Sequence, residues 1–122
     1  LTGRFRSDAD YDASDSRGAG RFPRATGEAL LANARKAEII AEVAARHPGA
    51  TSAQVALAWL LAQSTVPIPG TRNAARLAEN AGAARLTLSA ADCDRLDDVG
   101  PAAGDRYPGG RVPDWVSPPL GA

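Results

Sequence analysis

Apolar positions in the first half of the chain gather in two long stretches, and both predict helices. Between residues 27 and 47 they recur at roughly helical spacing until a Pro-Gly pair ends the pattern. In the next stretch Thr51 and Gln54 have the spacing of a capping box, in which each side chain bonds a free backbone N–H of the other residue. Residues 55–62 are apolar on every face, which is typical of a helix buried on several sides. We therefore expect this helix to pack inside a larger body than 122 residues readily supply.

Shorter signals in the second half predict a strand and a third helix. Residues 65–69 form a short extended segment, and their two prolines exclude them from the middle of an ordinary sheet. Asn73 is a suitable N-cap for a helix over residues 74–81, and Gly82 is a suitable C-cap. One strand cannot form a sheet, so we expect the missing strands to come from elsewhere.

The remaining segments are a last helix and two irregular ends. Ser89 and Asp92 repeat the capping-box spacing before a helix over residues 90–99. Residues 1–26 are rich in Gly, Asp, Ser and Arg and predict a long loop, and residues 101–122 predict an irregular tail.

Composition narrows the possible classes of function. Lys plus Arg and Asp plus Glu are 14 each, and this balance argues against nucleic acid or a membrane surface as a partner. The single cysteine, Cys93, excludes an internal disulfide and indicates a reducing compartment. No apolar run reaches the roughly 18 residues of a membrane helix, and we expect a cytoplasmic protein. The chain begins at Leu1 and contains no methionine, so we expect a processed product, a proteolytic remnant or part of a longer parent.

One segment has the pattern of a phosphate site. An extended stretch leads through a turn into a helix start, where free backbone N–H groups and the helix dipole favour an anion. Gly70 lets the backbone approach the anion, Thr71 offers a hydroxyl, and Arg72 offers a planar fork for phosphate oxygens. Arg76 reaches the same face one turn later. The residues alone are equally consistent with a plain loop that carries a surface arginine and a helix cap.

Five blocks, in order along the chain, together resemble the C-terminal part of the aldo-keto reductase family. The most specific is Ile68-Pro69-Gly70-Thr71-Arg72 followed by Arg76-Leu77-Ala78-Glu79-Asn80, which is similar to the family's NADP-binding signature. The others are Leu1-Thr2-Gly3-Arg4; Pro23-Arg24 with Gly27-Glu28 and Asn33; Thr51 to Leu61; and Leu88 to Asp92 with Gly104 to Pro108. Ala25 departs from the pattern, because the family has a phenylalanine there.

The resemblance implies the α/β class and a (β/α)8 TIM barrel. This chain would supply its C-terminal portion, from just after strand 7 to the C-terminus, and would be mostly helical. The whole of 1–122 would then belong to one barrel domain, with helices over 27–64, the last strand at 65–69, and a phosphate-binding turn and helix over 70–83. A C-terminal helix over 89–99 and the tail would complete the segment.

The implied cofactor is NADP(H), and the implied substrate is a small carbonyl compound. Leu1 and Gly3 would lie along the pyrophosphate, and Glu79 and Asn80 would contact the adenine edge. Thr71, Arg72 and Arg76 would hold the 2'-phosphate, and the two arginines favour NADPH over NADH. The implied cofactor-binding set is Leu1, Gly3, Ile68, Gly70, Thr71, Arg72, Arg76, Glu79 and Asn80.

No residue of this chain matches the family's catalytic tyrosine, lysine, aspartate and histidine. Lys36 is expected on a solvated helix face, and His47 at a helix end where a cation favours the dipole. Tyr11 and Tyr107 have no lysine near them in sequence, and Cys93 has the spacing of a packing residue.

Two functions follow as hypotheses. In the first, the parent is an NADPH-dependent oxidoreductase that reduces aldehydes and ketones to alcohols, and this chain supplies the cofactor-binding part but is inactive without the rest of the barrel. In the second, the chain is a non-catalytic helical interaction module that associates through residues 55–61, or a nucleotide-binding fragment without chemistry. Trp59 is expected in the core, whereas Trp115 either packs on the barrel exterior or borders the substrate mouth.

Overall fold

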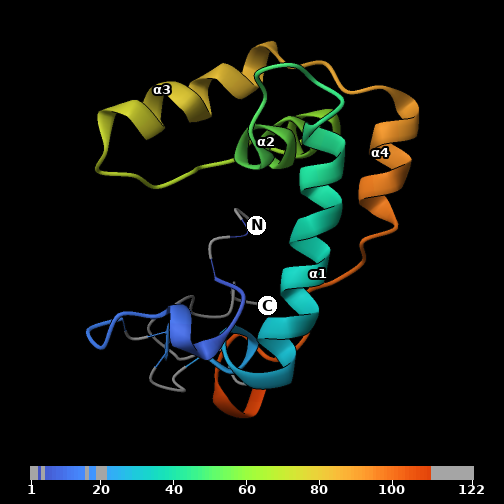
Figure 1. The fold of residues 1–122 in the computed structure, drawn as a ribbon. Coiled ribbons are helices and arrows are strands. Elements are labelled where there is room, and N and C mark those ends of the chain that lie inside the picture. The colour runs from blue at the N-terminus through green and yellow to red at the C-terminus, as the bar shows by residue number, and fades with distance from the viewer. Residues whose placement is uncertain (1–2, 4, 16, 19–21, 111–122) are drawn as a thin grey trace, which may run out of the picture. The chain divides into compact units, whose positions relative to one another are not determined.

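A computed structural model describes residues 3, 5–15, 17–18 and 22–110 of the chain. The α-helices in this part are α1 (Gly27–Ala44), α2 (Ser52–Ala62), α3 (Ala74–Gly82) and α4 (Ala90–Asp97) (Figure 1). Short 3-10 turns lie at Asp8–Asp10, Pro23–Ala25, Ala83–Arg85 and Pro108–Gly110. The described residues form two compact units, one with Gly3 and residues 35–100, the other with residues 5–15, 17–18, 22–34 and 101–110.

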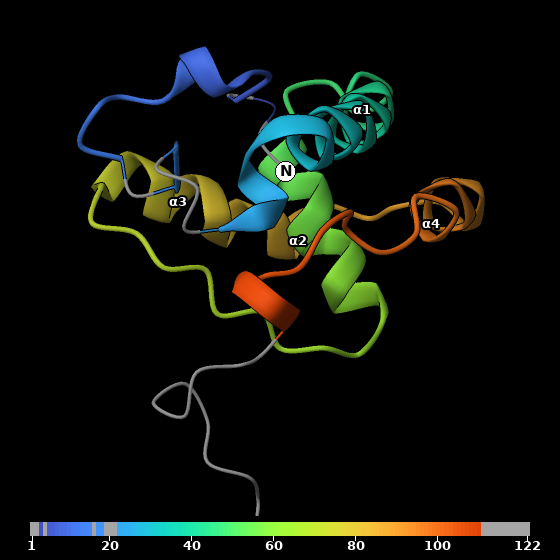
Figure 2. The same cartoon turned by 90° about the horizontal axis from the view of Figure 1, so that it is seen from below.

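The first unit is built around α2. Helix α3 lies on one side of α2, and α4 and the second half of α1 lie on the other (Figures 1 and 2). Val43 of α1 and Val55 of α2 are fully buried, and burying such a side chain contributes about 1.5–3 kcal/mol. The buried cluster consists of Ile40, Val43, Ala44, Val55 and Leu96, with Ala50, Trp59, Leu86 and Leu88 packed against it.

Three predicted N-caps are confirmed by their hydrogen bonds. Thr51 Oγ1 accepts from the N–H of Gln54 at 3.2 Å, and the N–H of Thr51 donates to Gln54 Oε1 at 3.0 Å. The same reciprocal pair joins Ser89 and Asp92 at the start of α4. Asn73 caps α3 through its side-chain oxygen.

Gly82 is not the C-cap of α3, and that prediction is wrong. Its φ of −59° and ψ of −25° are right-handed helical, and the chain continues directly into the turn Ala83–Arg85. A Cβ at Gly82 would lie 2.7 Å from Gln54 Nε2 on α2. Glycine at this position therefore permits close packing of the two helices rather than a left-handed turn.

The other predicted helix ends differ by a few residues. Helix α1 ends at Ala44 and not at residue 47, and α4 ends at Asp97 and not at residue 99. Gly100, three residues after the end of α4, has a φ of +66°. This left-handed conformation favours glycine and prevents the helix from continuing.

Residues 65–69 have no regular secondary structure, and no strand occurs in the part of the chain that the structure describes. Val66 and Ile68 are 84% and 94% exposed. A strand needs a neighbour to satisfy its backbone groups, so the segment's assignment as the last barrel strand stays a prediction.

Leu61 of α2 is 42% exposed, which agrees with the expectation that α2 has apolar surface left to cover.

The second unit joins the start of α1 to the segment after α4. The side chain of Asn33 bonds both backbone groups of Ala103: its Nδ2 donates to the carbonyl at 3.0 Å and its Oδ1 accepts from the N–H at 2.8 Å. The N–H of Arg24 donates to the carbonyl of Asp105 at 3.2 Å. Within the early loop, Phe5 stacks on Tyr11 with ring centroids 4.5 Å apart.

No helix in the described ranges is long and apolar enough to cross a membrane.

Candidate functional site

The turn before α3 is organised by its own side chains. The N–H of Asn73 donates to Thr71 Oγ1 at 3.1 Å, and Asn73 Oδ1 accepts from the N–H groups of Ala75 and Arg76 at 2.9 and 3.2 Å. Three of the four N–H groups that a helix start leaves free are thereby satisfied. Of these four N–H groups, only that of Ala74 has no bond to a described residue, so we expect side chains to hold most of an anion bound here.

The side chain of Asn73 should stabilise the start of α3. Asn73→Ala removes the acceptor of two N–H groups and should cost about 1 kcal/mol of local stability. The amides of Ala75 and Arg76 should then exchange hydrogen about fivefold faster. Asn73→Ser, which keeps a capping oxygen, is the matched control. Unchanged exchange in the alanine variant would show that the cap does not hold the start of α3.

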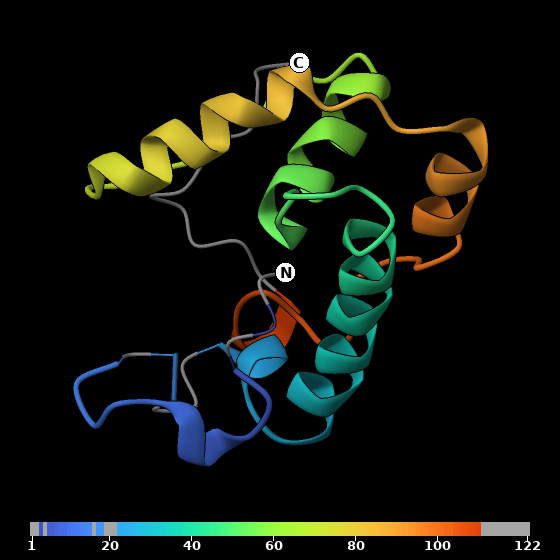
Figure 3. The ribbon, with the colours of Figure 1, turned by 45° about the horizontal axis from the view of Figure 1, so that its top comes forward.

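An open concavity lies at this turn, lined by Gly70, Thr71, Arg72, Asn73 and Arg76. Both arginines are exposed, and neither has an ion-pair partner among the residues described. The N-terminal end of α3 projects away from α1 and α4 (Figures 1 and 3). Two guanidinium groups that pair with no described carboxylate suit an anion with several oxygens.

The concavity brings together some of the predicted cofactor-binding residues. Four of them line it: Gly70, Thr71, Arg72 and Arg76. Asn73, predicted only as a cap, lines it as well. The lining does not include Gly3, Ile68, Glu79 or Asn80, and Leu1 lies outside the described residues.

Glu79 is held by α2. Its Oε1 accepts a hydrogen bond from Thr51 Oγ1 at 2.6 Å, and its backbone carbonyl accepts from Gln54 Nε2 at 2.9 Å. The sequence identified Thr51 and Gln54 as a capping box but gave no signal that they also reach Glu79. A capping motif is read from neighbouring residues, whereas this bond joins positions 28 residues apart.

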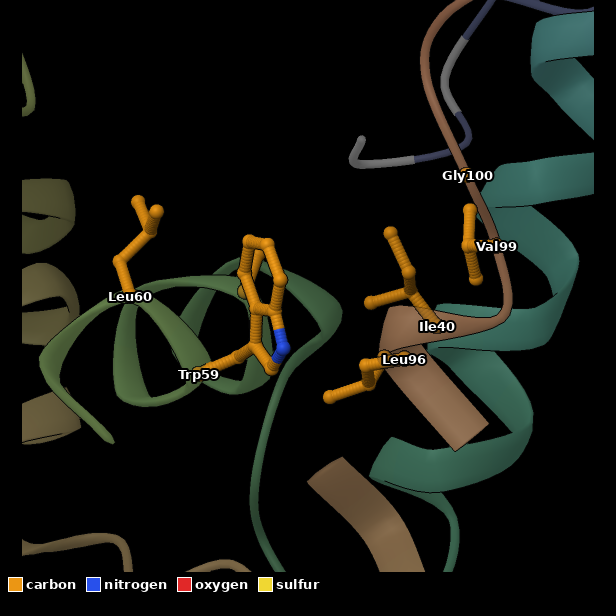
Figure 4. A pocket seen from close by; sticks show the side chains of 7 residues that line it. Ile40, Trp59, Leu60, Leu96, Val99 and Gly100 are labelled. Carbon is orange, nitrogen blue, oxygen red and sulfur yellow. The ribbon is translucent and has the colours of Figure 1, made fainter. Parts of the chain in front are cut away.

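A second concavity, of about 200 Å³, is lined by Ile40, Ala56, Trp59, Leu60, Leu96, Val99 and Gly100 (Figure 4). The side chains in its wall are all apolar apart from the indole N–H of Trp59, which donates to Asp97 Oδ1 at 2.7 Å. An apolar wall does not suit a phosphate. Trp59 packs against the buried cluster but is only partly buried itself.

Lys36 is not a solvated surface residue, contrary to the prediction. Its side chain is half-buried, and Nζ donates to the carbonyl of Val99 just after α4. Carbonyl groups at a helix end lack internal partners and carry partial negative charge, so they attract an ammonium group. Lys36 therefore has a structural role, and its bond in the described part of the chain goes to a backbone carbonyl and not to a tyrosine.

Asp92 is the one buried charged residue among those described, at 5% exposure. Its Oδ1 accepts from Arg46 Nη1 at 3.0 Å, and its Oδ2 lies 3.1 Å from His47 Nε2. The hydroxyl of Ser89 donates to Oδ2 at 2.7 Å. The bond from the Ser89 hydroxyl has the largest effect and lowers the pKa of Asp92, whereas burial raises it. The bonds from His47, the Ser89 N–H and Arg46 lower the pKa further, and the result is about 2.

The bonds to Asp92 join the end of α1 to the start of α4, and they give the ring of His47 its partner. The histidine was expected to interact with a helix dipole, and the structure places its ring against a carboxylate instead.

Cys93, one residue along, is half-buried in α4. No group of His, Cys, Asp and Glu residues suited to a metal ion occurs in the described ranges. Trp115 lies outside them.

The known proteins to which this chain is similar belong to one family. The model of the aldo/keto reductase family matches residues 1–101. An aldo-keto reductase of Gibberella moniliformis is 37% identical over 106 residues, covering 84% of this chain and 32% of that protein. The aldo-keto reductase yakc of Schizosaccharomyces pombe, whose name carries NADP(+), is 36% identical over 119 residues, covering 90% of this chain and 33% of that protein.

A probable aldo-keto reductase of Glycine max is 41% identical over 90 residues, which cover 70% of this chain and 26% of that protein. The chain thus spans about a third of the length of the curated relatives it matches. No solved structure matches it. The match to the family model extends over most of the sequence, and the chain belongs to the aldo/keto reductase family.

Proposed function

We propose that this chain forms the cofactor-binding part of an NADPH-dependent aldo-keto reductase. The observation that carries the proposal is the open concavity before α3, where Arg72 and Arg76 lie without a carboxylate partner among the described residues. NADPH differs from NADH by a 2'-phosphate on the adenosine ribose. NADH presents a neutral hydroxyl there, which would leave both guanidinium groups without an anion.

The side chains at the turn suit a phosphate group. Arg72 and Arg76 offer planar donor forks, and Thr71 keeps its hydroxyl hydrogen, because its oxygen only accepts in the bond from Asn73. The N–H of Ala74 is a further donor. Gly70 has no atom within 4 Å of the position that a Cβ would occupy, so the backbone is open there.

Membership of the family implies a TIM barrel. In such barrels the phosphate site is often built from the loops after strands 7 and 8 with a nearby helix N-terminus. We place the present chain after strand 7, with residues 65–69 as the last strand. The exposed Val66 and Ile68 support this placement, since both would be covered on joining a sheet.

The described residues bind and orient the cofactor, and the catalytic groups belong to the rest of the barrel. Lys36 is bonded to a backbone carbonyl and His47 to Asp92, so neither faces the concavity. When bound, NADPH would supply the hydride that reduces an aldehyde or ketone to an alcohol. The proposed partner is a small carbonyl substrate, with neither nucleic acid nor membrane involved.

The test is a reductase assay on the longer protein that contains this chain. We expect NADPH to be oxidised only in the presence of an aldehyde or ketone, with NADH a much poorer donor. Arg72→Ala should raise the KM for NADPH while leaving kcat nearly unchanged, because the phosphate contact is made equally in the ground and transition states. A failure of every carbonyl tested to consume either cofactor would refute the proposal.

A non-catalytic interaction module is the second candidate. It is favoured by the exposure of Leu61, Val66, Ile68 and Leu77, which together leave apolar surface on and around α2 and α3. If it is correct, the chain should self-associate in solution, and a charged substitution such as Leu61→Glu should abolish the association.

A further inference from the structure

Arg76 and Glu79 lie three residues apart on α3, which is a spacing at which opposite charges on one helix can pair. No ion pair joins them in the structure. Arg76 lines the concavity, whereas Glu79 is half-buried and contacts α2. Something must hold the carboxylate of Glu79 away from the arginine beside it.

The capping box of α2 supplies that restraint. Thr51 Oγ1 accepts a hydrogen bond from the N–H of Gln54 and donates one to Glu79 Oε1. The hydroxyl is therefore both an acceptor and a donor. The O–O distance of 2.6 Å lies in the range of short bonds to a charged oxygen. Gln54 is used in the same way: its Oε1 accepts from the N–H of Thr51, and its Nε2 donates to the carbonyl of Glu79.

We propose that Thr51 is a positioning residue for cofactor selectivity: by binding the Glu79 carboxylate against α2, it keeps Arg76 free for the 2'-phosphate of NADPH. This inference rests on the proposed function. In this proposal the N-cap of α2, Thr51, keeps the charge of Arg76 in the first turn of α3 available. Without the hydroxyl, the carboxylate of Glu79 can turn toward Arg76 and compete with the phosphate.

The expected effect is moderate and specific. An exposed pair at this spacing is weak, so its formation should lower the ratio of NADPH affinity to NADH affinity by about 1.5- to twofold. NADH lacks the 2'-phosphate, so its affinity should change little. The ratio also cancels any contact that Glu79 makes with adenine, because both cofactors carry the same base.

The experiment measures both affinities by equilibrium titration of the full chain and of its variants. Thr51→Val should lower the ratio, and Thr51→Ser, which keeps the hydroxyl, should not. Glu79→Gln alone should leave the ratio unchanged. The double variant Thr51→Val with Glu79→Gln should restore the wild-type ratio, because no carboxylate remains to pair with Arg76.

Glu79→Asp is a second route to the same state that leaves the cap of α2 intact. The shorter side chain withdraws the carboxylate from Thr51 but keeps its charge one turn from Arg76, so the ratio should fall as in Thr51→Val. This variant also decides the matter if Thr51→Val does not fold.

Two results would overturn the inference. One is an unchanged ratio in both Thr51→Val and Glu79→Asp. The other is a lowered ratio that the double variant does not restore, since the effect would then come from a loosened α2. Failure of the proposed function looks different: the wild type would not prefer NADPH, or Arg76→Ala would leave the ratio unchanged.

Discussion

Replacing Arg72 by alanine should weaken NADPH binding by about 10- to 150-fold and leave NADH binding nearly unchanged. The same result is expected for Arg76→Ala. A hydrogen bond to a charged group contributes about 1.5–3 kcal/mol, and this range converts to that loss of affinity. Both guanidinium groups line the concavity and have no competing carboxylate among the residues described, so their interaction with a phosphate is not offset by a lost ion pair.

The controls separate the phosphate contact from general charge. Arg85→Ala removes an exposed arginine beyond the far end of α3 and should change neither affinity. Arg72→Lys keeps the charge but loses the planar fork, so its NADPH affinity should lie between those of the wild type and Arg72→Ala. Calorimetric titration measures all of these constants. Equal losses for NADPH and NADH would contradict the assignment of the arginines to the 2'-phosphate.

Removing the carboxylate of Asp92 should destabilise the protein by about 3 kcal/mol. Asp92→Ala leaves the Arg46, His47 and Ser89 groups around it without their common partner. Breaking a buried charged pair by removing one member typically costs about 3–5 kcal/mol, and the partial exposure of Arg46 places the expected value at the lower end. Denaturant unfolding followed by circular dichroism measures the change.

The pH dependence of this contribution has a defined sign. The folded-state pKa of Asp92, about 2, is lower than its ordinary value of 3.8, so the ionised form is favoured by folding. Its stabilisation is therefore fully present above about pH 4 and is lost as the pH falls toward about 2. The difference in unfolding free energy between the wild type and Asp92→Asn should shrink across that window. A difference that stays constant from pH 5 to about pH 2 would show that the ionised carboxylate is not the stabilising group.

Local signals predicted the helix starts correctly. The cap residues Thr51, Asn73 and Ser89 act on N–H groups two or three positions away, so the motif contains the whole interaction. Gly70, Thr71, Arg72 and Arg76 line one concavity because they are nearly contiguous in sequence, and their predicted role in cofactor binding stays a prediction.

The failures involve contacts between distant parts of the chain. Gly82 resembles a C-cap, but its small size serves packing against Gln54 on another helix. Lys36 sits among charged neighbours in sequence, yet its partner is 63 residues away. The bond between Thr51 and Glu79 has the same character, since no local spacing predicts it. Residues 65–69 fail for a related reason: the sequence predicts a strand there, but the described part of the chain contains no other strand for it to pair with.

On the proposed function, the turn before α3 recognises a 2'-phosphate. Backbone amide NMR with two nucleotides tests it most directly: adenosine 2',5'-bisphosphate and adenosine 5'-monophosphate differ only in that group. We predict saturable shifts of the amide signals from Thr71 to Arg76 with the bisphosphate, much smaller shifts with the monophosphate, and neither in the Arg72→Ala, Arg76→Ala double variant. Equal shifts with both nucleotides, or shifts confined to other residues, would contradict the account.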